Sequence, residues 1–224
     1  MKIGVAIPCY YGHIQRLSDL LDSIEKQTIL PDKVVVSSSS TSELKCDKIY
    51  SFPLEVIITE CKQNASKNRN VAASKLLDMD YITFIDADDI MHPQRIEFLL
   101  KGFQIYDSDI ILHNYFESST GTIEDFLGIF KEINIRTHTL IQGLTSCITH
   151  INDYSDRVDK IHHSQVTVKR KIFQAVWFPE EREFETKEDC IFCYRVFSLP
   201  NIKHAYIKNE LSYYNPSSTG GIAQ

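Results

Sequence analysis

Short apolar segments alternate with amphipathic ones along the first half of the chain. Continuous apolar runs bounded by proline or polar residues indicate buried strands, whereas apolar residues three and four apart indicate helices. On these patterns we expect strands over residues 2–8, 31–38, 54–59, 81–86 and 108–116. We expect helices over residues 13–27, 64–78 and 93–106, the second with Asn64 or Ser66 as its N-cap. The alternation weakens after about residue 116, where we expect strands near 164–169 and 202–207 and a helix near 187–198.

Strands that alternate with helices predict an α/β fold, with a mostly parallel central sheet and helices on both faces. Ligands of such sheets bind in the crevice at the carboxyl ends of the strands. Three unusual stretches follow predicted strands at that edge: residues 8–11, the serine-rich residues 37–42 and the acidic residues 86–89. The sequence therefore predicts a ligand site there, in a chain without repeats or a linker-like boundary.

The composition narrows the possible partners. The 224 residues are 43% hydrophobic and 24% charged, as in ordinary soluble proteins, and the formal charge is −6. A general binder of nucleic acid or of an anionic membrane would need a basic face, so neither class is expected. We recognise no signal peptide and no membrane span, which favours a cytoplasmic protein, in a host cytoplasm if the source is viral.

Six cysteines are scattered through the chain, and among them only Cys190 and Cys193 have the CxxC spacing. A zinc site needs about four ligands, and the sequence offers no second pair. We therefore expect reduced, buried thiols rather than a metal site or a disulfide framework.

The run from Tyr81 to Ile85 ends in three acids, Asp86, Asp88 and Asp89. Asp86 and Asp88, two residues apart at a strand end, can aim their carboxylates at one point, where they repel each other unless a divalent cation is bound. Oxygen ligands suit Mg²⁺ or Mn²⁺, which keep positions open for substrate phosphates. Such a cation would stabilise the charge that develops when a sugar–diphosphate bond breaks. The alternatives are a solvated acidic turn, or Asp89 as a helix N-cap.

With these residues assembled, the chain resembles the nucleotide-sugar glycosyltransferases of the GT-A fold, specifically the large family-2 type. Residues 5–36 are similar to the family's opening strand, helix and turn into the second strand. Residues 64–97 resemble its asparagine-alanine-arginine helix and the DxD strand that follows. Residues 162–173 and 187–196 resemble the acceptor-side segment and the Glu-Asp helix. The resemblance implies a GT-A (Rossmann-like) fold over nearly the whole chain.

The resemblance implies a role for each matching residue on the donor side. Pro8 and Tyr10 would lie against the nucleotide base, with the Tyr10 ring stacked on it. Arg69 would face the base or the diphosphate. Asp86 would lie by the ribose or the metal, and Asp88 would be the principal ligand of Mn²⁺ or Mg²⁺. The alternative for Tyr10 is a core aromatic at a strand end. For Arg69 it is an exposed helix arginine, which would be the favoured interpretation without the family pattern.

On the acceptor side, the resemblance implies that Asp189 is the general base, which takes the proton of the acceptor hydroxyl. Glu188 is the competing candidate. Acids are also common in the first turn of a helix, where they interact favourably with the helix dipole, so both could be structural. His163 falls where the family's acceptor segment often has a histidine, and it would contact the acceptor or be a satisfied structural histidine.

The chain departs from the family pattern after its second strand. The family has an acidic Asp-Asp-Gly-Ser turn there, whereas this chain has four serines, of which Ser37 and Ser38 align with the acids. A serine hydroxyl can donate or accept a hydrogen bond, so we expect Ser37 or Ser38 to contact the base. The missing acids put the identity of the nucleotide base in doubt. The alternative to base contact is that the serine run is only a flexible loop.

We therefore expect a metal-dependent glycosyltransferase of the hexosyl or deoxyhexosyl type. It would be one GT-A domain, with residues 1–105 binding the donor and residues 106–224 shaping the acceptor site. The donor would be a nucleoside-diphosphate sugar, by family habit a UDP-sugar, and the acceptor a glycan or glycoprotein hydroxyl. We expect inversion of the configuration at the anomeric carbon, which is the family's habit, although a retaining transfer stays open. The alternatives are a non-catalytic nucleotide-sugar binding module and, less favoured because no glycine-rich phosphate loop is present, a nucleotidyltransferase or phosphohydrolase.

Residues 3–14 and 84–100 also resemble the capsid-glycan glycosyltransferases of large algal DNA viruses. The transferred sugar and the acceptor are not specified by the sequence. The polar tail, residues 215–224, is expected to be mobile. Residues 212–224 are compatible with a loop over the diphosphate, a natural terminus or the edge of a longer chain.

Overall fold

The computed structural model describes residues 1–44, 48–117, 121–137, 165–185 and 187–214. Every helix and strand expected in the first half is present, with bounds that shift by a few residues. They are β1 (Ile3–Tyr10), α1 (Ile14–Glu25), β2 (Lys33–Ser39), β3 (Leu54–Thr59), α2 (Ala65–Ser74), β4 (Tyr81–Phe84), α3 (Arg95–Tyr106) and β6 (Ile110–Glu117). A 3-10 turn, η1 (Tyr11–His13), precedes α1, and the two-residue strand β5 (Ile90–Met91) follows the acidic turn.

The second half contains the three elements that the sequence predicted and several short ones that it did not. The predicted ones are β8 (Val166–Lys169), α6 (Glu188–Phe197) and β9 (His204–Tyr214), the last several residues longer than expected. The additional ones are α4 (Ile123–Phe126), β7 (Ile135–Arg136), α5 (Arg170–Ala175) and η3 (Arg182–Phe184).

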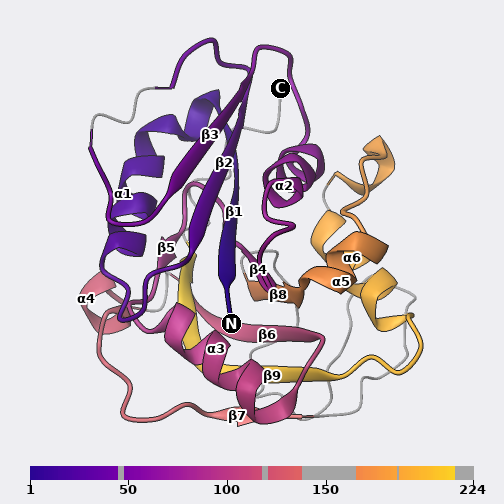
Figure 1. Cartoon of the computed structure of the whole chain (residues 1–224). Coiled ribbons are helices and arrows are strands. Elements are labelled where there is room, and N and C mark those ends of the chain that lie inside the picture. Colours follow the sequence, from indigo (N-terminus) through magenta and orange to yellow (C-terminus); the bar gives the residue numbers. More distant parts are fainter. Residues whose placement is uncertain (45–47, 118–120, 138–164, 186, 215–224) are drawn as a thin grey trace.

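Within the described residues, the strands form one sheet in the order β3-β2-β1-β4-β8-β6-β9-β5, with β7 paired to β9. The first four strands in that order are parallel. Strand β8 is antiparallel to both β4 and β6, and β6 and β9 are parallel again. The predicted α/β fold is confirmed, because a parallel sheet carries the first half of the chain and the second half extends the same sheet (Figure 1).

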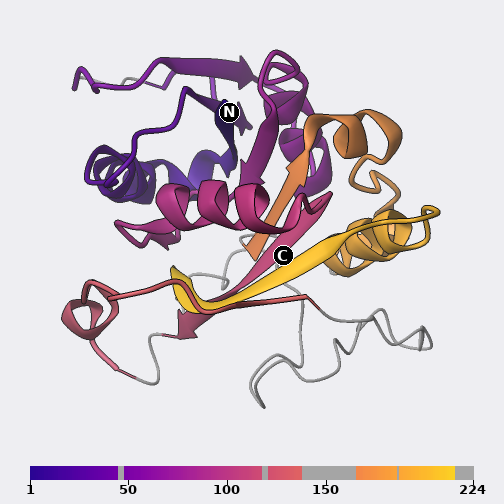
Figure 2. The ribbon, with the colours of Figure 1, turned by 60° about the horizontal axis from the view of Figure 1, so that its bottom comes forward.

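Helices cover both faces of the sheet, as predicted (Figures 1 and 2). On one face, α1 and α3 pack against Ile3, Val5 and Ile7 of β1. On the other, α2, α5 and α6 pack around Phe84 of β4. Helix α2 approaches β1 closely, since a Cβ at Gly4 would lie 2.7 Å from Leu76 just beyond the helix. This close approach brings the polar side chains of α2 within reach of the strand ends.

Two alternatives are excluded by the structure. Ser37 and Ser38 do not form a flexible loop: they lie within β2, as the expected strand over residues 31–38 predicts, and are paired with β1 on one side and β3 on the other. Asp89 does not cap α3, whose N-cap is Gln94. The other predicted cap is confirmed, because Asn64 accepts the backbone N–H of Lys67 at 2.9 Å.

The thiols are free wherever the structure describes them, but they are not uniformly buried. Cys9 and Cys193 are buried and Cys190 is half-buried, whereas Cys61 is exposed. The expectation of buried thiols is therefore wrong for Cys61.

In the described part of the chain, no helix has the length and apolar character that a bilayer crossing demands.

Candidate active site

The carboxyl ends of β1, β2 and β4 lie side by side at one edge of the sheet. Tyr10, the last residue of β1, pairs with Ser39, the last residue of β2. After β4 the chain turns sharply, and the backbone N–H of Asp89 donates to the carbonyl oxygen of Asp86 at 3.1 Å. This acidic turn, residues 86–89, lies at the edge where α/β sheets bind their ligands.

The guanidinium of Arg69 connects the acidic turn to the second half of the chain. Arg69 lies in α2, and its side chain is 1% exposed. Its Nη2 donates to Oδ1 of Asp86 at 3.1 Å, and its Nη1 donates to Oε1 of Glu188 at 3.0 Å. Burial lowers the pKa of Arg69, but the two carboxylates outweigh that effect and hold its pKa above the usual value. Arg69 is therefore charged and buried, and it is not the exposed helix arginine of the alternative interpretation.

Glu188 and Asp189 begin helix α6, and they differ in what they contact. Glu188 is buried and faces Arg69, whereas Asp189 is half-buried and its Oδ1 accepts the backbone N–H of Cys190 at 2.8 Å. Both positions suit a carboxylate, because the first turn of a helix presents unpaired N–H groups and the positive end of the dipole. Asp189 thus lies one residue from the ion pair that reaches Asp86, and its role as general base stays a prediction.

Asp88 faces the segment between β1 and α1. Its Oδ2 lies 3.6 Å from Nε2 of His13, and the two side chains are 8% and 19% exposed. The His13 ring meets the Tyr10 ring edge-on, with 4.2 Å between centroids. A Cβ at Gly12 would come within 2.6 Å of the Tyr10 hydroxyl, so this glycine leaves space for the ring. Tyr10 is half-buried beside the acidic turn, and stacking of its ring on a base stays a prediction.

A second buried arginine holds β4 at the base of the acidic turn. Arg95 is 0% exposed and donates to the hydroxyl oxygens of Thr83 and Ser212, both at 2.8 Å, and to the carbonyl oxygen of Phe84 at 2.7 Å. Burial lowers the pKa of Arg95 to about 9, and the negative charge of Asp89 opposes this shift. Because Ser212 lies in β9, Arg95 fixes the end of β4 to a strand from the other half of the chain.

Asn68 joins the ends of β1 and β2. Its Nδ2 donates to the carbonyl oxygen of Cys9 at 3.1 Å and to Oγ of Ser39 at 2.9 Å, and Oγ of Ser37 donates to its Oδ1 at 3.1 Å. Ser37 and Ser38 are both 0% exposed. Contact between either serine and a base stays a prediction, and it would require the strand ends to open.

Two tyrosines from the second half border the acidic turn. Tyr214, at the end of β9, meets the ring of Tyr115 from β6 at 5.9 Å between centroids. Burial raises the pKa of Tyr214, and the charges of Asp89, Asp88 and Asp86 raise it further. The Tyr214 hydroxyl therefore lies within the electrostatic field of the acidic turn and stays protonated at neutral pH.

The charges around the turn favour Asp88 as the carboxylate for a cation. Asp86 and Asp89 lie in the field of buried arginines, whereas Asp88 faces His13, which is charged only when protonated. Among the described residues, no three His, Cys, Asp or Glu side chains form a group that could hold a metal ion. Mg²⁺ commonly uses one or two carboxylates and takes its other ligands from water and substrate phosphates. The donor set at Asp88 fits an ion bound in that way.

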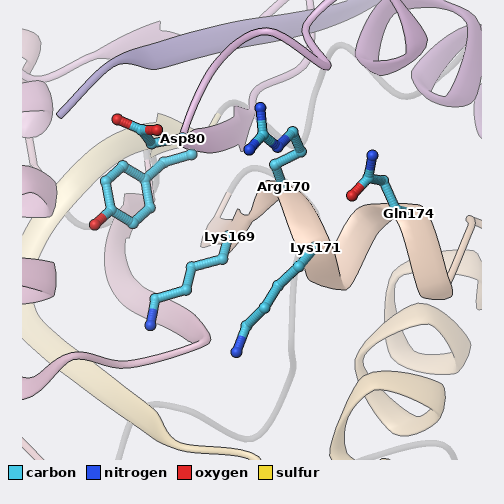
Figure 3. Close-up of a pocket in the computed structure, with 6 residues that line it drawn as sticks. Asp80, Lys169, Arg170, Lys171 and Gln174 are labelled. Atoms are coloured by element: carbon cyan, nitrogen blue, oxygen red, sulfur yellow. The ribbon is translucent and has the colours of Figure 1, made fainter.

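A pocket of about 310 Å³ lies elsewhere, at the amino end of β4 (Figure 3). It is lined by Asp80, Tyr81, Lys169, Arg170, Lys171 and Gln174. The lysines are already paired with acids, Lys169 with Asp107 at 2.6 Å and Lys171 with Asp109 at 2.7 Å. Their side chains extend away from the Arg170 guanidinium rather than toward a common point. The pocket therefore lacks the converging polar groups of a ligand site.

The residues predicted from the sequence largely share one edge of the sheet. Those in the described part of the chain are Pro8, Tyr10, Ser37, Ser38, Arg69, Asp86, Asp88, Glu188 and Asp189. His163 lies outside the described residues. Sequence reasoning missed His13, Asn68 and Tyr214, because none belongs to a charge cluster. The signals that could have found them are weak: Asn68 directly precedes Arg69, and His13 follows Tyr10 by three residues.

The chain is similar to known proteins over much of its length. The model of glycosyl transferase family 2 matches residues 4–176. An uncharacterized glycosyltransferase of Haemophilus influenzae is 30% identical over 100 residues, which are 44% of this chain and 33% of that protein. The O-antigen chain rhamnosyltransferase RfbN of Salmonella typhimurium is 34% identical over 120 residues, which are 50% of this chain and 35% of that protein.

Solved structures show a similar fold. The crystal structure of TarS residues 1–349 from S. aureus superposes with a TM-score of 0.70 at 19% identity and covers 96% of this chain and 60% of that one. The same protein is known in complex with UDP-GlcNAc, with a TM-score of 0.70 and coverage of 96% and 58%. The chain thus spans about a third of the length of these two curated relatives and less than two thirds of TarS 1–349.

Proposed function

The chain belongs to glycosyl transferase family 2, and we propose that it transfers a sugar from a UDP-sugar to a hydroxyl group of a glycan or glycoprotein. The observation that carries this proposal is the convergence, at one sheet edge, of the acidic turn with the start of α6. One buried arginine, Arg69, joins Asp86 of that turn to Glu188, the residue next to the candidate base Asp189. The hexosyl or deoxyhexosyl nature of the transferred sugar is part of the same proposal.

The donor would bind along the ends of β1, β2 and β4. The half-buried Tyr10 ring offers a face for a base, and the UDP and UDP-GlcNAc complexes of TarS support a uridine donor for a chain of this fold. Asn68 fixes the strand ends against which the base would lie. The serines that replace the family's acidic turn leave the choice of base to experiment.

We further propose that Asp88 holds a Mn²⁺ or Mg²⁺ ion, with Asp86 beside it. When bound, such an ion supplies positive charge to the diphosphate leaving group. The residues of the chain do the rest of the positioning: Arg69 holds the Asp86 carboxylate, and His13 faces Asp88. In this proposal Asp88 is the principal ligand, so metal affinity would depend on its carboxylate.

Asp189 would act as the general base. The acceptor oxygen attacks the anomeric carbon, the bond from that carbon to the diphosphate oxygen breaks, and the acceptor proton passes to the Asp189 carboxylate. Glu188 is less suited to this step, because its carboxylate is buried and paired with Arg69. An attack from the face opposite the diphosphate would invert the configuration, as we propose. The resemblance to viral capsid-glycan enzymes stays a prediction about the acceptor, since the relatives described above are bacterial.

The first test is calorimetric titration with UDP, GDP, dTDP and CMP, each with and without Mn²⁺. We expect UDP to bind in the presence of Mn²⁺ and to bind at least about tenfold more weakly to Asp88→Asn, because the cation loses its carboxylate. Asp78→Asn is the matched control, since Asp78 is an exposed acid just beyond α2. Failure of every nucleotide to bind the unchanged protein would exclude the donor site.

Turnover separates an enzyme from a non-catalytic binding module. Hydrolysis of UDP-GlcNAc can be followed without knowing the acceptor, because water takes its place. We expect Asp189→Asn to keep UDP affinity and to lower kcat by about 10²–10⁴-fold. Equal, measurable rates for Asp189→Asn and the unchanged protein would remove Asp189 as the base. UDP binding without any hydrolysis by the unchanged protein would favour the binding-module alternative.

A further inference from the structure

Arg69 is placed where it can contact two carboxylates that come from distant parts of the chain. Asp86 is 17 residues away in sequence, in the turn after β4, and Glu188 is 119 residues away, at the start of α6. The Asp86 and Glu188 side chains are 21% and 11% exposed, against 1% for Arg69. The guanidinium therefore closes a largely buried bridge between the donor edge and the helix that carries the candidate base.

The bridge is held in place by further contacts from α2. The Arg69 guanidinium lies over the Phe178 ring, at 5.4 Å from its centroid. Phe178 is itself fixed by Asn70 of α2, whose Oδ1 accepts the Phe178 N–H at 3.0 Å and whose Nδ2 donates to the Phe178 carbonyl at 2.9 Å. Because these contacts restrain the plane of the guanidinium, its two terminal nitrogens have fixed directions.

We infer that Arg69 and Glu188 are positioning residues, which hold the first turn of α6, and with it Asp189, at a fixed place relative to Asp86. This inference rests on the proposed function and adds to it a division of labour between the two adjacent acids. Glu188 anchors the helix to the donor edge, and Asp189, the next residue, would act on the acceptor. Only an arginine suits the bridge, since a lysine offers one compact charge where two separate carboxylates must be reached.

The test compares variants of the bridge with an ion pair made by the last turn of the same helix. In Glu188→Gln the side chain keeps its size but loses its charge, and in Arg69→Lys the charge stays but the planar fork is lost. Glu181→Gln is the matched control, because Glu181 makes an exposed pair with Arg195 of α6 at 3.5 Å. Each variant is measured for UDP affinity by calorimetry and for kcat and KM of UDP-GlcNAc hydrolysis over a range of pH.

For Glu188→Gln we expect kcat to fall about 10–100-fold, because a misplacement of about 1 Å can cost that much. We expect KM and the Kd of UDP to stay within about twofold. In the pH profile of kcat, the fall in rate toward acid pH should persist, because Asp189 is still present as the base. Arg69→Lys should change the same parameters in the same direction, and the double variant should be no slower than the slower single one, since both changes break one bridge. Glu181→Gln should behave like the unchanged protein.

Other outcomes would overturn the inference in distinguishable ways. Unchanged kcat in Glu188→Gln would show that the bridge does not position the base. Loss of UDP affinity together with kcat would assign the bridge to structure alone. Disappearance of the fall in rate toward acid pH would make Glu188 itself the base. If the unchanged protein neither binds UDP nor hydrolyses UDP-GlcNAc, the proposed function fails first and the positioning role fails with it.

Discussion

Arg69 and Arg95 each place a guanidinium where solvent does not reach, and the sequence predicted neither. The buried face of α2 is polar, comprising Ser66, Asn68, Arg69 and Asn70 beside two alanines, so no apolar stripe indicated which side of the helix faces inward. The burial of the two arginines is stabilised by tertiary contacts. Arg69 donates to two carboxylates, and Arg95 donates to two hydroxyl oxygens and a carbonyl oxygen. Partners that are more than 100 residues away cannot be deduced from local spacing.

The thiols offer a test of residue burial near the site. Burial raises the pKa of Cys9 to about 12, and burial also raises that of Cys193 well above its usual value. Only the thiolate reacts with alkylating reagents, so both cysteines should be protected by burial and by protonation. Cys61 is exposed. In the native protein at pH 8, we expect iodoacetamide to modify Cys61 at least about a hundredfold faster than Cys9 or Cys193.

Peptide mass spectrometry at timed intervals would measure these rates, with the urea-unfolded protein as control, in which all three cysteines should react alike. Modification of Cys9 as fast as Cys61 in the native protein would mean that the end of β1 opens readily. Such opening would also make the buried serines of β2 accessible to a ligand.

At the scale of elements, the serine run shows how a polar stretch continues a buried strand, one residue beyond the expected end at Ser38. Ser37, Ser38 and Ser39 continue β2 because they have strands on both sides: Ser37 pairs with Pro8 and Ile57, and the next two residues keep the register. Backbone hydrogen bonds from two neighbours, together with the Asn68 side chain, satisfy this polar segment without exposing it. The strand ends at Ser39, and the positive φ of 57° at Ser40, the next residue, turns the chain away.

Periodicity predicted the regular elements well, but it made no prediction of how the strands of the second half pair. Strands β1 to β4 have local crossover connections, so their order follows from the alternation of strands and helices. By contrast, β8 lies between β4 and β6, and β5 and β7 are only two residues long. Strand pairing over such long separations leaves no periodic signal in a single sequence.

The edge opposite the site depends on one aspartate that joins three strands. Asp109 precedes β6, its carboxylate pairs with Lys171 at 2.7 Å beyond β8, and it accepts the backbone N–H of Lys203, before β9, at 3.1 Å. Burial raises the pKa of Asp109, but these partners outweigh it and the pKa lies below its usual value. The carboxylate therefore contributes stability at pH values above about 4, and this contribution is lost as pH falls through the lowered pKa.

We expect Asp109→Asn to lower the free energy of unfolding by about 1–3 kcal/mol at pH 7, because the partners of a buried, charge-assisted hydrogen bond lose their match. The difference from the unchanged protein should shrink as the pH falls through the lowered pKa of Asp109, below which both proteins carry a neutral side chain. Urea titrations at several pH values would measure it. Asp107→Asn is the control: Asp107 pairs with the same group of lysines, but its side chain is 73% exposed, so its midpoint should shift less. An equal shift for the two variants would contradict the role of burial.

At the scale of the whole molecule, residues 1–105 and the described residues after 105 share their interior. On one face of the sheet, Ala6 and Phe84 from the first half pack in the same cluster as Val168 and Phe192 from the second. On the other face, residues of β1 and α3 share a cluster with Ile111, Ala205 and Leu211. We propose, accordingly, that residues 1–105 and 106–224 divide the chain by the ligand each would bind, within one folding unit.

The donor half should therefore fail to fold when it is produced alone. A fragment of residues 1–105 would expose β4 as an edge strand, since its partner β8 belongs to the second half, and would leave Arg95 without Ser212 and Arg69 without Glu188. We expect this fragment to lack a cooperative urea transition, because its apolar faces lose the residues that cover them. The full chain should unfold in one transition, with coincident far-ultraviolet circular dichroism and tyrosine–tryptophan fluorescence. A fragment that unfolds cooperatively and binds UDP with Mn²⁺ would show instead that the donor half is autonomous, and that the second half was added to a fold already complete.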